Sequence, residues 1–75
     1  MSILDRINAL REKFPRAEQQ LAEYILANPQ QIRDMPSQLL AQMVGISQAS
    51  VVRFSQKLGY KGYPDFKFAL SDTLH

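Results

Sequence analysis

The chain has 75 residues, of which 45% are hydrophobic and 21% charged, with a formal net charge of +2 and no cysteine. This length allows one domain with a small core, and the composition is that of a folded globular module rather than a disordered segment. The missing cysteines exclude disulfides and thiolate metal sites, and the one histidine, His75, is the last residue, so the sequence predicts no metal site and no cofactor.

The charge of the chain is unevenly distributed. Residues 1–45 carry five basic and five acidic side chains, whereas residues 46–75 carry four basic and two acidic ones. A basic surplus in one part of a small domain is a weak indication of a polyanionic partner. The apolar runs are far too short for a membrane span and the N-terminal residues are not signal-like, so we expect a cytoplasmic protein with no membrane contact.

The first 35 residues predict two amphipathic helices and a short third one. Apolar residues at helical spacing run from Ile3 to Phe14, and Pro15 ends this segment. A second helix is predicted from Arg16 to Ala27, and Asn28-Pro29 ends it because the residue before a proline avoids the α region. The segment "PQQIRDM" is long enough only for a short helix. The inward face of the second helix is predicted to carry Ala17, Leu21, Tyr24, Ile25 and Leu26.

The second half of the chain predicts three more helices. Pro36 marks the start of two closely spaced ones, Gly59 follows the second of these, and the segment "YKGYPDFKFALSDTL" supplies the last. No segment alternates with a period of two, and no Asn-Gly or Asp-Gly hairpin signal occurs. The sequence therefore predicts an all-α fold, a helical bundle of five main helices and one short helix in a single domain spanning 1–75.

Residues 37–56 fit the pattern of a helix-turn-helix. Ala41 is small where the second helix of the motif crosses the first, and Gly45 permits the left-handed backbone of a sharp turn. Ile46 is expected to fill the angle between the two helices. Ser47 is expected to accept a hydrogen bond from an unpaired amide of the next turn and so to start the second helix.

The second helix of the motif, from about Gln48 to Leu58, separates an apolar face from a polar one. Val51, Phe54 and Leu58 share the inward face. The outward face is made of short or polar side chains, which suits insertion into a DNA major groove: glutamine can pair with adenine edges, arginine with guanine, and small apolar groups with the thymine methyl. This face carries Ala49, Val52, Arg53, Gln56 and, near its edge, Lys57.

The predicted DNA contacts extend beyond this face. The N-terminus of the helix presents free amides that favour a phosphate. Ser47 and Gln48 lie at this N-terminus and are therefore included among the predicted contacts. Taken singly, each surface arginine or lysine is more often simply solvated, and the surrounding motif is what favours a contact. The predicted DNA-binding residues are Ser37, Gln38, Ser47, Gln48, Ala49, Ser50, Val52, Arg53, Gln56, Lys57 and Lys61, and we assign no catalytic, cofactor-binding or metal-binding residue.

Two stretches of the chain resemble a known family. "ALREKFPRAEQQLAEYILANPQQIRDM" followed by "LLAQMVGISQASVVRFSQKLGYKGYPDFKFAL" is similar to the N-terminal DNA-binding domain of RpiR-type bacterial transcription regulators. The resemblance implies a homeodomain-like helical bundle around a helix-turn-helix, and a homodimer that binds double-stranded DNA operators of sugar-catabolism genes, as repressor or activator. It also implies a second, sugar-isomerase-like domain that binds a phosphosugar effector. We expect this chain, which stops at His75, to lack that domain.

Two positions depart from the family pattern. Pro36 stands where the family usually has Thr or Ser at the start of the first helix of the motif, so we expect Ser37 to take over the capping role one residue later. Leu39 replaces a usual acidic residue, and we expect it to add to the core or to contact a partner.

Two other function classes remain as alternatives. A helical protein-interaction or dimerisation module would use the fold only as a scaffold, with Ile3, Ile7 and Leu10 as a dimer seam. An enzyme is disfavoured, because no serine, histidine and carboxylate set can be assembled from this chain.

Overall fold

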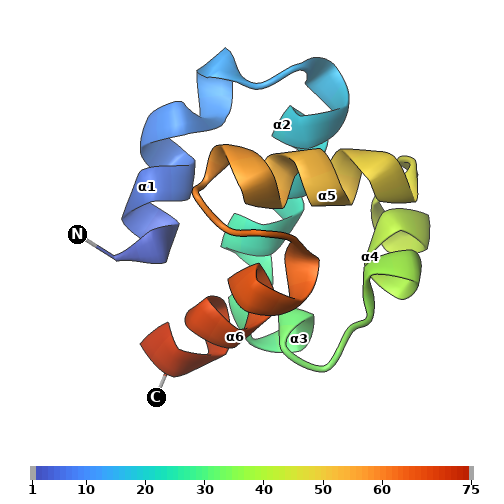
Figure 1. The fold of residues 1–75 in the computed structure, drawn as a ribbon. Coiled ribbons are helices and arrows are strands. Elements are labelled where there is room, and N and C mark those ends of the chain that lie inside the picture. The colour runs from blue at the N-terminus through green and yellow to red at the C-terminus, as the bar shows by residue number, and fades with distance from the viewer. Residues whose placement is uncertain (1, 75) are drawn as a thin grey trace.

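The computed structural model describes residues 2–74. It contains six α-helices and a short 3₁₀ helix, arranged around one core (Figure 1). The prediction of an all-α bundle with five main helices and one short helix is confirmed, and no strand occurs between residues 2 and 74. None of the described helices has the length and apolar character that crossing a membrane requires. The elements are α1 (Ile3–Leu10), η1 (Arg11–Lys13), α2 (Arg16–Ala27), α3 (Pro29–Ile32), α4 (Ser37–Val44), α5 (Gln48–Lys57) and α6 (Tyr63–Thr73).

The first helix shows how local sequence sets helix ends. A capping box starts α1: the Asp5 amide donates to Ser2 Oγ at 3.2 Å, and the Ser2 amide donates to Asp5 Oδ2 at 3.3 Å. Phe14 is extended, with φ −79° and ψ 149°, as expected of a residue before proline. The chain cannot stay α-helical up to Pro15, and the predicted first segment is therefore divided into α1 and the tighter η1.

The core is built around the aromatic ring of Phe54 on α5. Its centroid lies 5.0 Å from that of Phe14 and 5.7 Å from that of Phe66, the latter in an edge-to-face arrangement that aromatic quadrupoles favour. Helix α5 crosses the middle of the molecule and packs against α2, α4 and α6 (Figure 1). Its orientation is therefore fixed by three neighbouring helices.

The inward face of α2 differs from the prediction by a rotation of the helix. Leu21 and Ile25 are fully buried as expected, but the other buried positions are Glu18 and Ala22. Spacings of three, four and seven residues from position 18 place these four on one stripe. Ala17, Tyr24 and Leu26, which were predicted to face inward, lie at the sides of this stripe and are half-buried.

Tyr63, at the start of α6, ties the last helix to the segment between α3 and α4. Its hydroxyl donates to the carbonyl oxygen of Met35 at 2.6 Å and lies 3.2 Å from that of Ile32. The side chain is buried, and this burial raises the pKa of Tyr63 from 10.0 to about 12 because the charged phenolate would lose its hydration.

The dimer seam considered for α1 is not on the surface. Ile3 and Ile7 are 5% and 0% exposed and belong to the domain's own core, and Leu10 is half-buried against it. An amphipathic helix in a chain of this size is needed for the core itself. The large apolar side chains that are exposed lie elsewhere, at Leu39, Met43, Val52 and Phe68.

Candidate nucleic-acid interface

The turn between α4 and α5 has the geometry that its sequence predicts. Gly45 adopts φ +84°, and its amide donates to the carbonyl oxygen of Ala41 at 2.8 Å. The Ile46 amide donates to the same carbonyl at 3.0 Å, and the Ile46 side chain packs on the core. A side chain at position 45 would meet no atom within 4 Å, so glycine is required for its backbone conformation rather than for space.

Ser47 caps α5 as predicted. Its hydroxyl accepts a hydrogen bond from the Ser50 amide at 3.1 Å and lies 3.0 Å from the Ser50 hydroxyl. Ser50 is itself among the predicted DNA contacts. Its side chain is buried, 4% exposed, and its hydroxyl is bonded within the domain, where it also accepts from Arg53 Nη2 at 3.2 Å. Ser50 therefore lies on the side of α5 that packs inward.

The outer face of α5 is exposed to solvent. Ala49, Val52, Arg53 and Gln56 are all exposed on it, whereas Val51, Phe54 and Leu58 on the opposite face are buried. The predicted division of this helix into an inward and an outward face is confirmed. The helix ends one residue earlier than predicted, at Lys57.

The beginning of α4 lies next to the beginning of α5. Pro36 precedes α4 in an extended conformation, and no side chain caps the helix. Ser37 does not take over the capping role that was predicted for it: it is the first helical residue, and its hydroxyl accepts a hydrogen bond from Gln48 Nε2 at 2.7 Å. Gln38 is exposed beside it. Leu39 is 40% exposed and does not belong to the core, which was one of its two expected uses.

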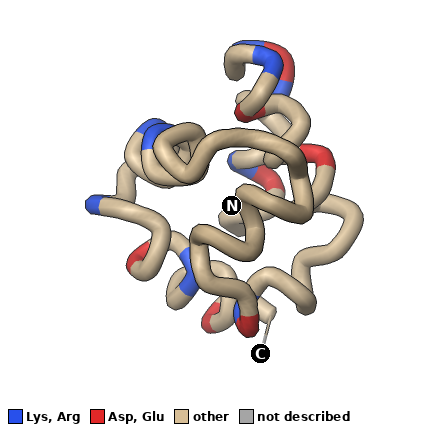
Figure 2. The backbone as a smooth tube through the Cα atoms, turned by 90° about the vertical axis from the view of Figure 1, so that its right-hand side faces the viewer, with Lys and Arg blue, Asp and Glu red and all other residues tan. Residues whose placement is uncertain are grey.

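The motif carries no charged side chain before Arg53. No ionisable side chain occurs from Met35 to Val52, and the side of the molecule formed by α4 and the start of α5 is correspondingly uncharged (Figure 2). Positive charge begins at Arg53 and continues at Lys57 and Lys61, all of them exposed. The positive charge of this surface therefore lies at its edge, beside the uncharged part of the motif.

A buried carboxylate lies beneath two of these cations. The side chain of Glu18 on α2 is 3% exposed, and Lys57 Nζ donates to its Oε1 at 2.7 Å. Arg53 Nε lies 3.8 Å from Oε2 of the same carboxylate. Lys57, one of the predicted DNA contacts, forms this ion pair through its ammonium group. Sequence reasoning missed Glu18, although its spacing from the buried Leu21 could have indicated an inward position.

Arg6 is a second residue that sequence reasoning missed. From α1 it donates a hydrogen bond to the carbonyl oxygen of Leu58, at the C-terminus of α5. An arginine at a helix C-terminus pairs with free carbonyls and with the negative end of the helix dipole. Gly59 follows with φ +100°, as predicted for the end of this helix. Nothing in the sequence relates Arg6 to position 58, because the two are 52 residues apart.

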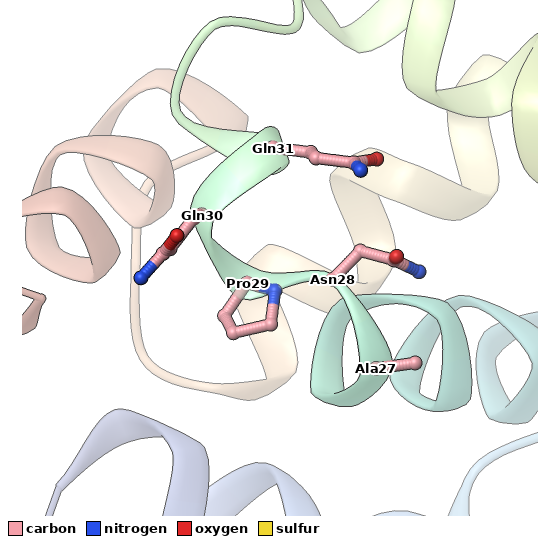
Figure 3. Close-up of a pocket in the computed structure, with 5 residues that line it drawn as sticks. All are labelled: Ala27, Asn28, Pro29, Gln30 and Gln31. Atoms are coloured by element: carbon pink, nitrogen blue, oxygen red, sulfur yellow. The ribbon is translucent and has the colours of Figure 1, made fainter.

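A surface hollow of about 330 Å³ lies away from the motif, where α2 meets α3. The side-chain amides of Asn28 and Gln31 extend toward the same side, while Gln30 points away (Figure 3). None of the five lining residues is charged and none belongs to α4 or α5, so the hollow has no part in this surface. Within residues 2–74 no group of three potential metal-ligating side chains comes together.

A family model described as the helix-turn-helix domain of the rpiR family matches residues 1–75. The chain belongs to the rpiR family. It is a helix-turn-helix domain of the DNA-binding, transcription-regulating type, and the family is one of regulators rather than enzymes. The resemblance noted from the sequence is confirmed.

Relatives of this rpiR-family domain are found among curated proteins and solved structures. The uncharacterized HTH-type transcriptional regulator YfhH of Escherichia coli (strain K12) is 46% identical over 74 residues, which is 99% of this chain and 26% of YfhH. The N-terminal domain of ybbH from Bacillus subtilis superposes with a TM-score of 0.90 at 32% identity, covering 96% of this chain and 88% of that one. The Vibrio vulnificus NanR protein, complexed with ManNAc-6P, superposes with a TM-score of 0.95 at 36% identity, covering 97% of this chain and 28% of NanR. The chain thus spans about a quarter of the length of YfhH and NanR.

Proposed function

We propose that this domain binds double-stranded DNA sequence-specifically, with the outer face of α5 in the major groove. The observation that carries the proposal is the exposure of Ala49, Val52, Arg53 and Gln56 on a helix that three other helices hold in place. Because the backbone of this helix is already held in place, binding does not have to order it, which favours sequence reading over loose association.

The side chains of this face suggest which base edges they read. Arg53 has the donor geometry for guanine O6 and N7, and Gln56 can pair with adenine. Val52 and Ala49 offer apolar contact to thymine methyl groups. Gln48 is a further candidate for adenine, provided that its amide leaves the Ser37 hydroxyl on binding.

Phosphate contacts are proposed at the edges of this face. The free amides at the starts of α4 and α5, with Ser37, Gln38 and Ser47 beside them, favour a phosphate at each helix N-terminus. Lys61 follows α5, is exposed, and supplies a positive charge. Contacts of this kind fix the position of the domain on DNA without selecting its sequence.

We further propose that the domain acts as part of a homodimer in the cytoplasm on operators of sugar-metabolism genes. NanR, in its complex with ManNAc-6P, supports a phosphosugar effector for longer proteins of this family. Such an effector would act through a further domain. Two copies of α5 related by a twofold axis would address half-sites about 34 Å apart, or a multiple of that distance.

Selection of bound fragments from a random duplex library tests the proposal. The selection is made with the 75-residue domain at 50 mM and 150 mM salt, because phosphate contacts weaken steeply as salt rises. Enrichment of one motif at both salt concentrations is expected, and a palindrome would support the homodimer. Equal recovery of all sequences would contradict sequence-specific binding.

A further inference from the structure

Glu18 stands out because it is a buried acid next to a surface proposed to bind an anion. Its side chain is 3% exposed and extends from α2 toward the two cationic side chains of α5, Arg53 and Lys57. A buried carboxylate is costly unless a cation or hydrogen-bond donors stabilise it, so its two neighbours on α5 are constrained by it. The carboxylate therefore affects which positive charges remain available to DNA.

The two cations are held unequally. The Lys57 ammonium donates a direct hydrogen bond to Glu18 Oε1 at 2.7 Å, whereas Arg53 Nε is 3.8 Å from Oε2, beyond hydrogen-bond distance. Arg53 donates instead to the neutral hydroxyl of Ser50 at 3.2 Å, and its side chain remains 56% exposed. If Arg53 turned toward a base, Glu18 would keep its close partner. If Lys57 turned toward a phosphate, Glu18 would lose that partner.

We propose that Glu18 is a positioning residue that keeps Lys57 away from DNA and leaves Arg53 free to read a base. In this way Glu18 sets the ratio of specific to non-specific binding: a lysine on a phosphate would strengthen binding to every sequence, whereas an arginine on guanine discriminates between sequences. The inference rests on the proposed function, because it assigns a role within the same DNA-binding surface.

Glu18→Gln tests this role, with Glu23→Gln as the matched control. Both changes remove one negative charge from α2, but Glu23 is exposed and forms no ion pair among the described residues. Binding is measured between 50 and 200 mM salt to the duplex selected above and to a scrambled duplex of the same length. One added phosphate contact raises the magnitude of the salt slope by about 0.9, so the gain in affinity for the scrambled duplex shrinks roughly three- to fourfold over this range.

Three results are expected. Glu18→Gln increases the salt slope on the scrambled duplex by about one and lowers the preference for the selected duplex. Glu23→Gln leaves both quantities close to those of the unmodified domain. The double variant Glu18→Gln/Lys57→Gln returns the slope to that of the unmodified domain, because the released ammonium group is gone. A purely structural role of Glu18 would not produce this pattern.

An unchanged salt slope in Glu18→Gln, or equal changes in the Glu18 and Glu23 variants, would overturn the proposal. If Glu18→Gln fails to fold, as judged by circular dichroism, the salt slope of Lys57→Gln is measured on the scrambled duplex instead. The proposal predicts that this slope equals that of the unmodified domain. A slope smaller by about one would show that Lys57 already contacts phosphate, which would overturn the proposal. Failure of the unmodified domain to prefer its selected duplex would overturn the proposed function as well, whereas a failure confined to the variants would leave that function standing.

Discussion

Substitution of Gly45 by alanine measures how much the turn of the motif depends on a left-handed backbone. At φ +84° the Cβ of an alanine comes too close to the following carbonyl oxygen, which costs about 1–2 kcal/mol. No atom of a neighbouring residue lies within 4 Å of this Cβ, so no further clash is added. Alanine also restricts the unfolded chain, which favours folding by about 0.4–1 kcal/mol wherever the native backbone accepts it. The expected net effect is a loss of stability.

Gly62→Ala is the matched control that isolates the backbone penalty. Gly62 is extended, with φ −175°, and an added Cβ would make an ordinary contact of 3.8 Å with Pro64. The unfolded-state term is the same in both variants, and Gly62→Ala adds the smaller cost of replacing glycine by alanine at the N-cap of α6. Gly45→Ala should therefore be the less stable variant by about 1 kcal/mol, which corresponds to roughly 4–8 °C in thermal midpoint for a domain of this size. Equal midpoints, measured by circular dichroism on heating, would refute the assignment of Gly45 as the residue that requires positive φ.

Five further substitutions test other parts of the structure. Tyr63→Phe should lower the free energy of unfolding by about 1–2 kcal/mol through lost hydrogen bonds. Since the Tyr63 pKa is raised from 10.0 to about 12, this advantage of tyrosine is fully present below pH 10 and lost as pH rises toward 12, which urea denaturation of both proteins can follow; a constant difference across that range would contradict the buried phenol. Ser47→Ala should cost about 1 kcal/mol by removing the cap of α5, and Ser37→Ala, which caps nothing, should cost less in the same assay. Arg53→Ala should weaken binding to the selected duplex by about 1–3 kcal/mol more than binding to scrambled DNA, whereas Lys61→Ala should weaken both alike and lower the salt slope by about one; equal losses for Arg53→Ala would reassign it to phosphate.

The features that the sequence predicts correctly are those that depend on neighbouring residues. Gly45, Ser47 and the alternation of inward and outward positions on α5 are local: each is set by backbone conformation or by helical period within a few residues. The same helical period places Phe54 on the inward face and Arg53 on the outward face. For this reason the turn, the cap and most of the outer face could be predicted without a structure.

The features that the sequence does not predict depend on contacts between distant segments. The pairing of Glu18 with Lys57 joins residues 39 positions apart, and Arg6 meets the end of α5 from 52 positions away. The spacing of Glu18 from Leu21 is compatible with an inward position, but a glutamate in an amphipathic helix is normally exposed, and its ion pair with Lys57 depends on the packing of α5 against α2. The burial of Ser50 is likewise not evident from its sequence position, since a small polar residue at the edge of a helix face can form hydrogen bonds on either side.

The most direct test of DNA reading by α5 is a titration of the ¹⁵N-labelled domain with the selected duplex, followed by amide chemical-shift mapping. If α5 enters the major groove, the largest shifts will occur at Ala49, Val52, Arg53 and Gln56 and at the start of α4, and they will be weaker with scrambled DNA. Shifts centred on α1 and α6, with α5 unaffected, would contradict the central claim that this helix reads the DNA.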